Sequence, residues 1–140
     1  MYYSVYTDYG LGSGSFFLLE NFLQATSHTT SITLTAGTTY QFYVTATNAV
    51  GTGTPSSILS VLAAKIPDAP LGPYNNAAVT SGYQVGLTWS TDGTYDGGSP
   101  IIDYSVFYST SSTGPFTLFK VETTKSSTVT GLTPGVYYYF

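Results

Sequence analysis

The feature that most constrains the fold of this chain is a segment that occurs twice. "LTAGTTYQF" begins at Leu34 and "LTPGVYYYF" begins at Leu132, an offset of 98 residues. A second match, "YSV" at Tyr3 and again at Tyr104, has an offset of 101 residues. Two matches with nearly the same offset indicate a repeated unit of about 100 residues, the size of a small β-sandwich. We therefore expect two copies of one unit, each present in part.

The repeated segments alternate between the two faces of a strand with a period of two. In "YQFYVTA", one face receives Tyr40, Phe42, Val44 and Ala46, which predicts a strand buried on one side. "YQVGLTW" and "DYSVFY" alternate in the same way, and Gly, Ser, Asp and Pro are concentrated between such segments, as in turns. Strands are expected over residues 1–9, 15–24, 29–35, 38–49, 55–63, 74–80, 83–91, 100–109, 115–122, 126–131 and 136–140.

A boundary between the two copies is predicted in the stretch "AAKIPDAPLGP", from Ala63 to Pro73. Its three prolines each fix φ and remove a backbone donor, so a central strand cannot run through it. We place the first module at residues 1–65 and the second at residues 66–140.

Charge and composition exclude several classes of partner. The chain has no Arg, three Lys and a net charge of -4, so it lacks the cations needed to neutralise phosphates, and we expect no nucleic-acid partner. No apolar run approaches 18 residues, so no membrane span is expected in this segment, and the first residues do not resemble a signal peptide. Without cysteine there is neither a disulfide scaffold nor a cysteine zinc site.

Several motifs, taken in order, give the chain a resemblance to fibronectin type III modules. They are "PDAP" from Pro67, Trp89, "DGGSPIIDYSVFY" from Asp96, "LTPGVYYYF", and "NAVGTGTPS" from Asn48. The resemblance implies an all-β fold: tandem immunoglobulin-like Greek-key β-sandwiches. It also implies that residues 1–65 are the C-terminal part of one module, strands C to G, and residues 66–140 the N-terminal part of the next, strands A to F.

The expected core combines the repeat with this resemblance. A Trp in a small sandwich fills much of the space between the sheets. Two tyrosines stand at the position of the tyrosine corner, where the hydroxyl caps a backbone group a few residues upstream. The predicted core residues are Trp89, Tyr40, Tyr138, Leu34, Leu132, Tyr104 and Val106.

The sequence offers no convincing catalytic or metal site. His28 is the only histidine and lies in a Ser/Thr-rich stretch with no flanking signature, so a solvated turn residue is the better interpretation. Asp92 and Asp96 bracket a Gly-rich loop, but their spacing is not that of a calcium loop, and turn-forming Asp-Gly pairs explain them. We expect no enzymatic activity, no metal and no cofactor.

Outward aromatic residues form the candidate interaction surface. Exposed rings can stack on sugars or pack against a neighbouring module, although cross-strand stabilisation of the sheet is an alternative role. No Asn-x-Ser/Thr sequon is present, whereas Ser/Thr-rich loops would permit O-linked sugar. The residues of this surface are Tyr43, Phe107, Tyr137 and Tyr139.

These observations predict a non-catalytic structural or adhesive module of a long extracellular or cell-surface repeat protein. Its partners would be neighbouring modules or copies of itself, with glycans as a further candidate. Strands absent from each partial module would come from the same longer polypeptide or be donated by a neighbouring chain, and strand donation or inter-module packing would build a filament. Two alternatives stay open: a carbohydrate-binding or accessory module of a secreted hydrolase, and an intracellular scaffold.

Overall fold

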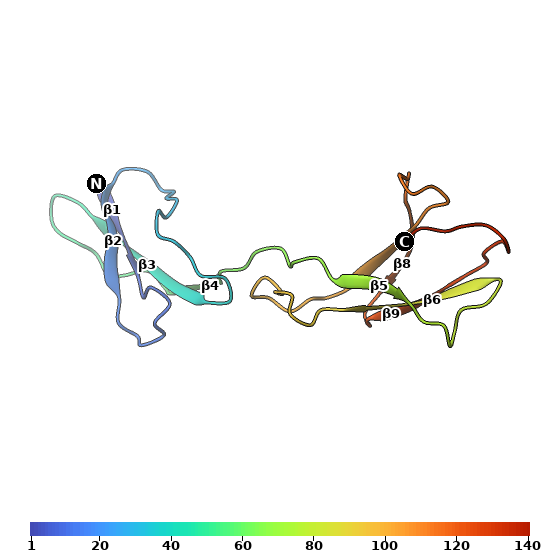
Figure 1. Ribbon diagram of the computed structural model, residues 1–140. Helices are drawn as coiled ribbons and strands as arrows, with labels where there is room; N and C mark the ends of the chain where they lie inside the picture. The colour runs from blue at the N-terminus through green and yellow to red at the C-terminus, as the bar shows by residue number, and fades with distance from the viewer. The chain divides into compact units, whose positions relative to one another are not determined.

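The computed structural model describes all of residues 1–140 and contains β-strands but no helix, which confirms the all-β prediction. Two compact units are present, and they are described separately below: unit 1 is residues 1–66 with 97–99, and unit 2 is residues 67–96 with 100–140 (Figure 1). Unit 1 contains β1 (Tyr2–Thr7), β2 (Phe17–Leu23), β3 (Thr39–Thr47) and β4 (Leu59–Leu62). Unit 2 contains β5 (Leu71–Asn75), β6 (Gln84–Ser90), β7 (Tyr104–Tyr108), β8 (Thr117–Glu122) and β9 (Ser126–Thr130).

Unit 1 is a single antiparallel sheet with the strand order β2-β1-β3-β4. β1 and β3 pair without interruption from Tyr2↔Thr47 to Thr7↔Phe42. The pairing of β1 with β2 is irregular, with register shifts on both sides of Val5. No second sheet packs on this one within the unit; on one of its faces, residues from the segment 25–30 line a cavity together with residues of the sheet.

That arrangement corrects two expectations for the first module. Of the residues predicted to share a buried face, Tyr40 is 6% exposed, but Val44 is 37% exposed and Ala46 is also exposed. Leu34, predicted to be a core residue, is 43% exposed. Strand alternation places these residues on one side of β3, but their burial needs an opposing layer, and this unit has no second sheet.

Three of the expected strands also differ from the structure. Residues 29–35 form no strand, because no neighbouring strand pairs with them. Pairing in residues 136–140 is limited to the single bridge Ser109↔Tyr139. The strand expected at 74–80 lies instead at β5, because Asn76 starts a turn in which its carbonyl accepts the N–H groups of Val79 and Thr80.

Unit 2 is a sandwich of two sheets. One has the order β5-β6-β9 and the other is the β7-β8 hairpin. The core between them contains Leu87 (4% exposed), Val106 (8%) and Val129 (0%), contributed by β6, β7 and β9. The partly buried residues packed against this core are Val85, Trp89, Phe119, Leu132 and Phe140.

β5 shows how a strand can contain proline. Pro73 lies in the middle of β5, but β5 is at the edge of its sheet, with β6 as its only neighbour. Proline is tolerated at an edge because the missing N–H would otherwise point to solvent. The pairing with β6 shifts register between Leu71 and Tyr74, on either side of Pro73. The proline-bearing stretch therefore limits pairing without excluding it.

The sequence repeat is a structural repeat at the level of single hydrogen bonds. In unit 1 the hydroxyl of Tyr40 accepts the N–H of Thr35 (2.9 Å), and in unit 2 the hydroxyl of Tyr138 accepts the N–H of Thr133 (3.1 Å). Each Tyr therefore caps a backbone donor five residues upstream, which is the geometry of a tyrosine corner. The two copies build the same turn before the same strand.

A backbone hydrogen bond at the start of the segment that follows each tyrosine corner is also repeated. The N–H of Asp8 donates to the carbonyl of Gln41 (3.2 Å), and the N–H of Ser109 donates to the carbonyl of Tyr139 (2.9 Å). The four residues are related by the offsets of 101 and 98 found in the sequence. Thus β1 and β3 in unit 1 correspond to β7 and the segment around Tyr139 in unit 2.

The core of unit 2 gives a quantitative prediction. Leu87→Ala should lower the free energy of unfolding of unit 2 by about 2–5 kcal/mol, because a fully buried Leu loses its transfer energy and leaves a cavity. Urea unfolding monitored by the fluorescence of Trp89, the only Trp of the chain, measures this. Leu11→Ala, at a position 65% exposed, is the control and should leave the transition in place. Equal transitions for the two variants would contradict the assigned core.

Candidate interaction surfaces

One side of the unit 1 sheet carries apolar side chains that are half-buried or exposed, and we call this side the open face. It borders a cavity of about 430 Å³. No Asp, Glu, Lys or Arg lines this cavity, whereas the exposed His28 is among its lining residues. The open face comprises Tyr3, Val5, Leu19, Phe42, Val44, Leu59 and Val61.

The open face follows from strand alternation. Val5 pairs with Val44 across β1 and β3, and directly opposed residues of an antiparallel pair point to the same side of the sheet. β4 extends this side with Leu59 and Val61, which are 61% and 44% exposed. Soluble proteins rarely leave a continuous apolar surface of this kind uncovered, so the open face is a candidate interaction surface.

The opposite side of the same sheet is covered by its own side chains. The ring of Tyr43 stacks on that of Tyr6 at 4.7 Å between centroids, and Phe16 contacts it at 4.9 Å. Tyr43 is therefore half-buried in a cross-strand cluster rather than free. Its inclusion in an exposed interaction surface is not supported by this geometry, which matches the cross-strand role instead.

The other three predicted surface aromatics lie in unit 2. Tyr137 is 84% exposed, Tyr139 is 42% exposed, and Phe107 is 45% exposed on β7. Tyr139 pairs with Ser109, two residues beyond Phe107, so these two rings belong to adjoining segments. Unit 2 therefore carries three of the four residues that the sequence grouped together.

Three of the predicted core residues of unit 2, which are Trp89, Tyr104 and Val106, line a second cavity, of about 390 Å³. Tyr104 contacts Trp89 with ring centroids 5.3 Å apart, and Tyr138 contacts Tyr108 at 6.3 Å. The indole Nε1–H of Trp89 is buried without a hydrogen-bond partner. Trp89 and Val106 both line the cavity, which also extends along β7 to Phe107.

Asp8 is the polar residue that the sequence prediction missed. It is 0% exposed, and its Oδ1 accepts the N–H groups of Gln41 (2.9 Å) and Gly10 (2.8 Å), while Oδ2 accepts that of Gly12 (3.2 Å). These bonds, that from Gln41 above all, hold the pKa of the Asp8 carboxyl below its ordinary value, although burial opposes the shift. Through these hydrogen bonds Asp8 holds the β1-β2 loop against β3.

Gly10 explains why this loop can approach β3 so closely. Its φ is +74°, and a Cβ there would lie 2.5 Å from a side-chain carbon of Thr38. The "DYG" triplet is the local signal, because Asp accepting N–H groups two and four residues later is ordinary turn chemistry. The bond to Gln41, 33 residues away, had no signal in the sequence.

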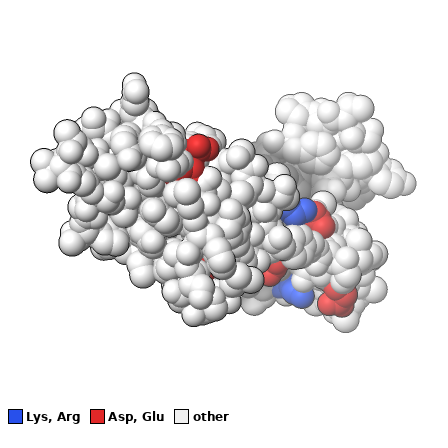
Figure 2. Space-filling view, turned by 90° about the vertical axis from the view of Figure 1, so that its left-hand side faces the viewer, with Lys and Arg blue, Asp and Glu red and all other residues white.

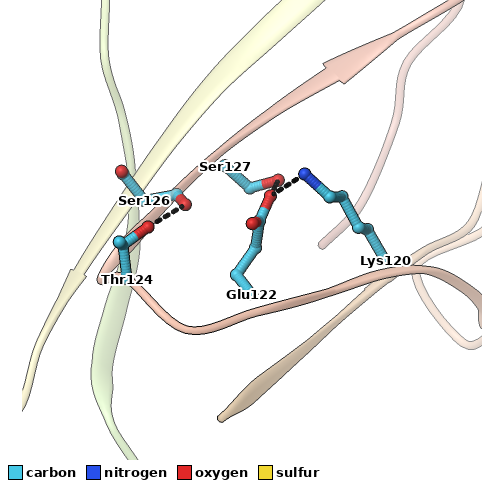
Figure 3. Close-up of polar contacts among 5 residues, drawn as sticks. All are labelled: Lys120, Glu122, Thr124, Ser126 and Ser127. Atoms are coloured by element: carbon cyan, nitrogen blue, oxygen red, sulfur yellow. Dashed lines mark hydrogen bonds and ion pairs between the residues drawn. The ribbon is translucent and has the colours of Figure 1, made fainter.

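A polar cluster connects the two sheets of unit 2 (Figure 3). Glu122 at the end of β8 accepts the hydroxyl of Ser127 on β9 (2.8 Å) and lies 3.0 Å from the ammonium of Lys120. The hydrogen bond from Lys120, followed by that from Ser127, lowers the pKa of the Glu122 carboxyl. This cluster holds the β7-β8 hairpin against β9, and the Glu122 carboxylate in it is engaged by both Ser127 and Lys120.

Charged side chains are sparse on the molecular surface. Figure 2 shows a few small blue and red groups on a largely uncharged face. Nowhere in the chain do three His, Asp or Glu side chains gather as metal ligands would. No helix is present that is long and apolar enough to cross a membrane.

The two-sheet packing of unit 2 and the tyrosine corners in both units define an immunoglobulin-like β-sandwich class. The family model described as "Fibronectin type III domain" matches residues 71–140, which is half of the chain. The chain belongs to the fibronectin type III family, as its motifs indicated.

Solved structures extend the likeness beyond the matched residues. The crystal structure of titin domains A168-A170 is 26% identical over 70% of this chain and 32% of its own length, with a TM-score of 0.52. The FN1-FN3 domains of chicken CNTN1 are 17% identical over 97% of this chain and 47% of their own, with a TM-score of 0.50. The chain thus spans about a third of the length of the titin structure and about half of the length of the CNTN1 structure. The second match shows the fold alone.

Asp8 gives a prediction about pH. Its folded pKa lies below the unfolded value of about 3.9, so it stabilises unit 1 above that pH, and this contribution is lost as the pH falls through the lowered pKa. Asp8→Asn should lower the free energy of unfolding of unit 1 at pH 7, because the amide cannot accept all three N–H groups. Between pH 5 and 2, the free energy of unfolding of the variant should fall less steeply than that of the unaltered chain. Urea midpoints followed by circular dichroism test this, with Asp92→Asn, an exposed turn residue, as control. Parallel pH profiles for chain and variant would contradict it.

Proposed function

We propose that this chain is a non-catalytic structural segment of a long extracellular or cell-surface repeat protein, with its module boundary near residues 65 and 66. The observation that carries the proposal is the repeat of one tyrosine-corner turn in two units of a single chain. Tandem modules of one repeated fold act as spacers, and proline-bearing connections limit their hinge freedom. Modules of this family are usually non-catalytic, which supports the same role.

Filament formation belongs to the same proposal. The open face and the low charge of the chain allow close contact with further modules, through packing or through donated strands. The partners would be neighbouring modules or further copies of the chain. Ser/Thr-rich loops such as that around Ser111 are solvent-exposed and would be accessible to O-linked sugar.

Stretching the full-length protein between two surfaces tests the spacer role. Each unfolding event should release about 100 residues, or about 330–360 Å of contour length, because an extended residue spans at most ~3.3–3.6 Å. Equally spaced force peaks at this interval are the expected result. Extension without discrete peaks, or with intervals unrelated to the repeat, would refute a chain of independent modules.

A second candidate function, carbohydrate binding, is favoured by the exposure of Tyr137 and Tyr139. Exposed aromatic rings can stack on sugar rings. A glycan array probed with the chain and with the Tyr137→Ala/Tyr139→Ala double variant separates the two functions. Sugar binding that disappears in the double variant would replace the spacer proposal with an accessory module of a secreted hydrolase. Absence of binding in both proteins is the result that the spacer proposal predicts.

A further inference from the structure

The side of the unit 1 sheet opposite the open face carries two tyrosines in contact. Tyr6 on β1 and Tyr43 on β3 are directly opposed in the register of the two strands. Their ring centroids are 4.7 Å apart and the ring planes differ by 13°, so the rings stack nearly parallel. The other contacting tyrosine pair, Tyr108 with Tyr138, is 6.3 Å apart and tilted by 42°. Tyr6 and Tyr43 are therefore the tyrosines best placed to react with each other.

The backbone and a third ring hold this pair in place. β1 and β3 are joined through six consecutive residue pairs without a register shift, so the two tyrosines cannot slip past one another. Directly opposed residues of an antiparallel pair have Cβ atoms about 4.5–5.5 Å apart. Phe16 contacts the ring of Tyr43 at 4.9 Å, but a phenyl ring has no hydroxyl from which a phenoxyl radical could form. Within this cluster of three rings, the reactive neighbour of Tyr43 is Tyr6.

We propose that Tyr6 and Tyr43 are a modification site at which one-electron oxidation forms a covalent dityrosine bond between β1 and β3. The co-reactant is a one-electron oxidant of the haem peroxidase class, which consumes hydrogen peroxide. The chain has 14 tyrosines and no cysteine, so no disulfide can join its strands. The link depends on the β1-β3 pair alone and is independent of the proposed function.

The stacked geometry suits the chemistry of phenoxyl coupling. Each tyrosine gives one electron to the oxidant and its phenolic proton to water, which leaves two neutral radicals with unpaired electron density on the ring carbons ortho to oxygen. The orbitals of these Cε atoms are perpendicular to the ring planes, so in a stacked pair they face each other. The two unpaired electrons form a Cε–Cε bond, after which each of these carbons loses its hydrogen as a proton and each oxygen takes up a proton. The pair loses two hydrogen atoms, and one hydrogen peroxide becomes two water molecules.

Proximity favours this link over links between chains. Coupling of two rings that are already in contact needs no collision between molecules, whereas coupling of a freely exposed ring does. Tyr6 and Tyr43 are half-buried, while Tyr137 is 84% exposed and is available to a second chain. A bond between residues 6 and 43 also restricts the unfolded chain, as a disulfide does, so oxidised unit 1 should unfold at a higher urea concentration.

Oxidation followed by digestion tests the proposal. The chain is treated at low concentration with a haem peroxidase and hydrogen peroxide, then denatured and cleaved by a Glu-specific protease. Glu20 and Glu122 are the only Glu residues, so Tyr6 and Tyr43 fall on different fragments. Mass spectrometry should find residues 1–20 joined to residues 21–122, with a mass two hydrogen atoms below the sum of the two fragments. The joined fraction should not change on further dilution, because the coupling is intramolecular.

Two phenylalanine variants identify the partners. Tyr43→Phe keeps a ring in the stack, so circular dichroism should be unchanged, but the joined fraction should fall more than about tenfold because the pre-aligned phenol is gone. Tyr137→Phe should leave the joined fraction unchanged and reduce the covalent dimers formed at high concentration, which also shows that the oxidant is active. Separation of residues 1–20 from 21–122 in an oxidised chain that still forms dimers would overturn the proposal. Equal joined fractions in Tyr43→Phe and the unaltered chain would also overturn it.

Discussion

A sheet with one apolar face gains stability when another layer covers that face and removes it from water, and this constraint distinguishes the two units. In unit 2 the β7-β8 hairpin and the β5-β6-β9 sheet cover each other, so Val129 is fully buried. In unit 1 the corresponding side of the β2-β1-β3-β4 sheet remains open, and Val44 is exposed. The same sequence pattern therefore gives a core in one unit and an uncovered apolar face in the other.

The repeat is preserved at the turn where a backbone N–H needs a hydrogen-bond acceptor. Tyr40 and Tyr138 each cap an N–H that would otherwise lie unpaired at the start of the same strand. Beyond this turn the two copies differ: Asp8 binds three N–H groups in unit 1, whereas Ser109 occupies the corresponding position in unit 2. The tyrosine-corner turn is common to both units, whereas the residue at the position of Asp8 and Ser109, and its contacts, differ between them.

Much of the fold could be predicted from the sequence because alternation and turn residues are local signals. β1, β3, β6 and β7 all lie within their predicted ranges. Leu34 and residues 29–35 were mispredicted because burial and pairing depend on partners that alternation cannot reveal. Asp8 was missed for a related reason, since it accepts a hydrogen bond from Gln41, 33 residues along the chain. Local pattern identifies a strand, but only the assembled sheet shows what the strand faces.

Binding of a dye that fluoresces on apolar surfaces tests most directly whether the first unit carries an uncovered face. The chain should bind the dye under native conditions, and Val44→Lys should abolish most of that signal by placing a charge on the open face. Ile102→Lys, a change at a residue 85% exposed in unit 2, should leave it unchanged. No dye binding by the folded chain, or equal binding by both variants, would contradict the account.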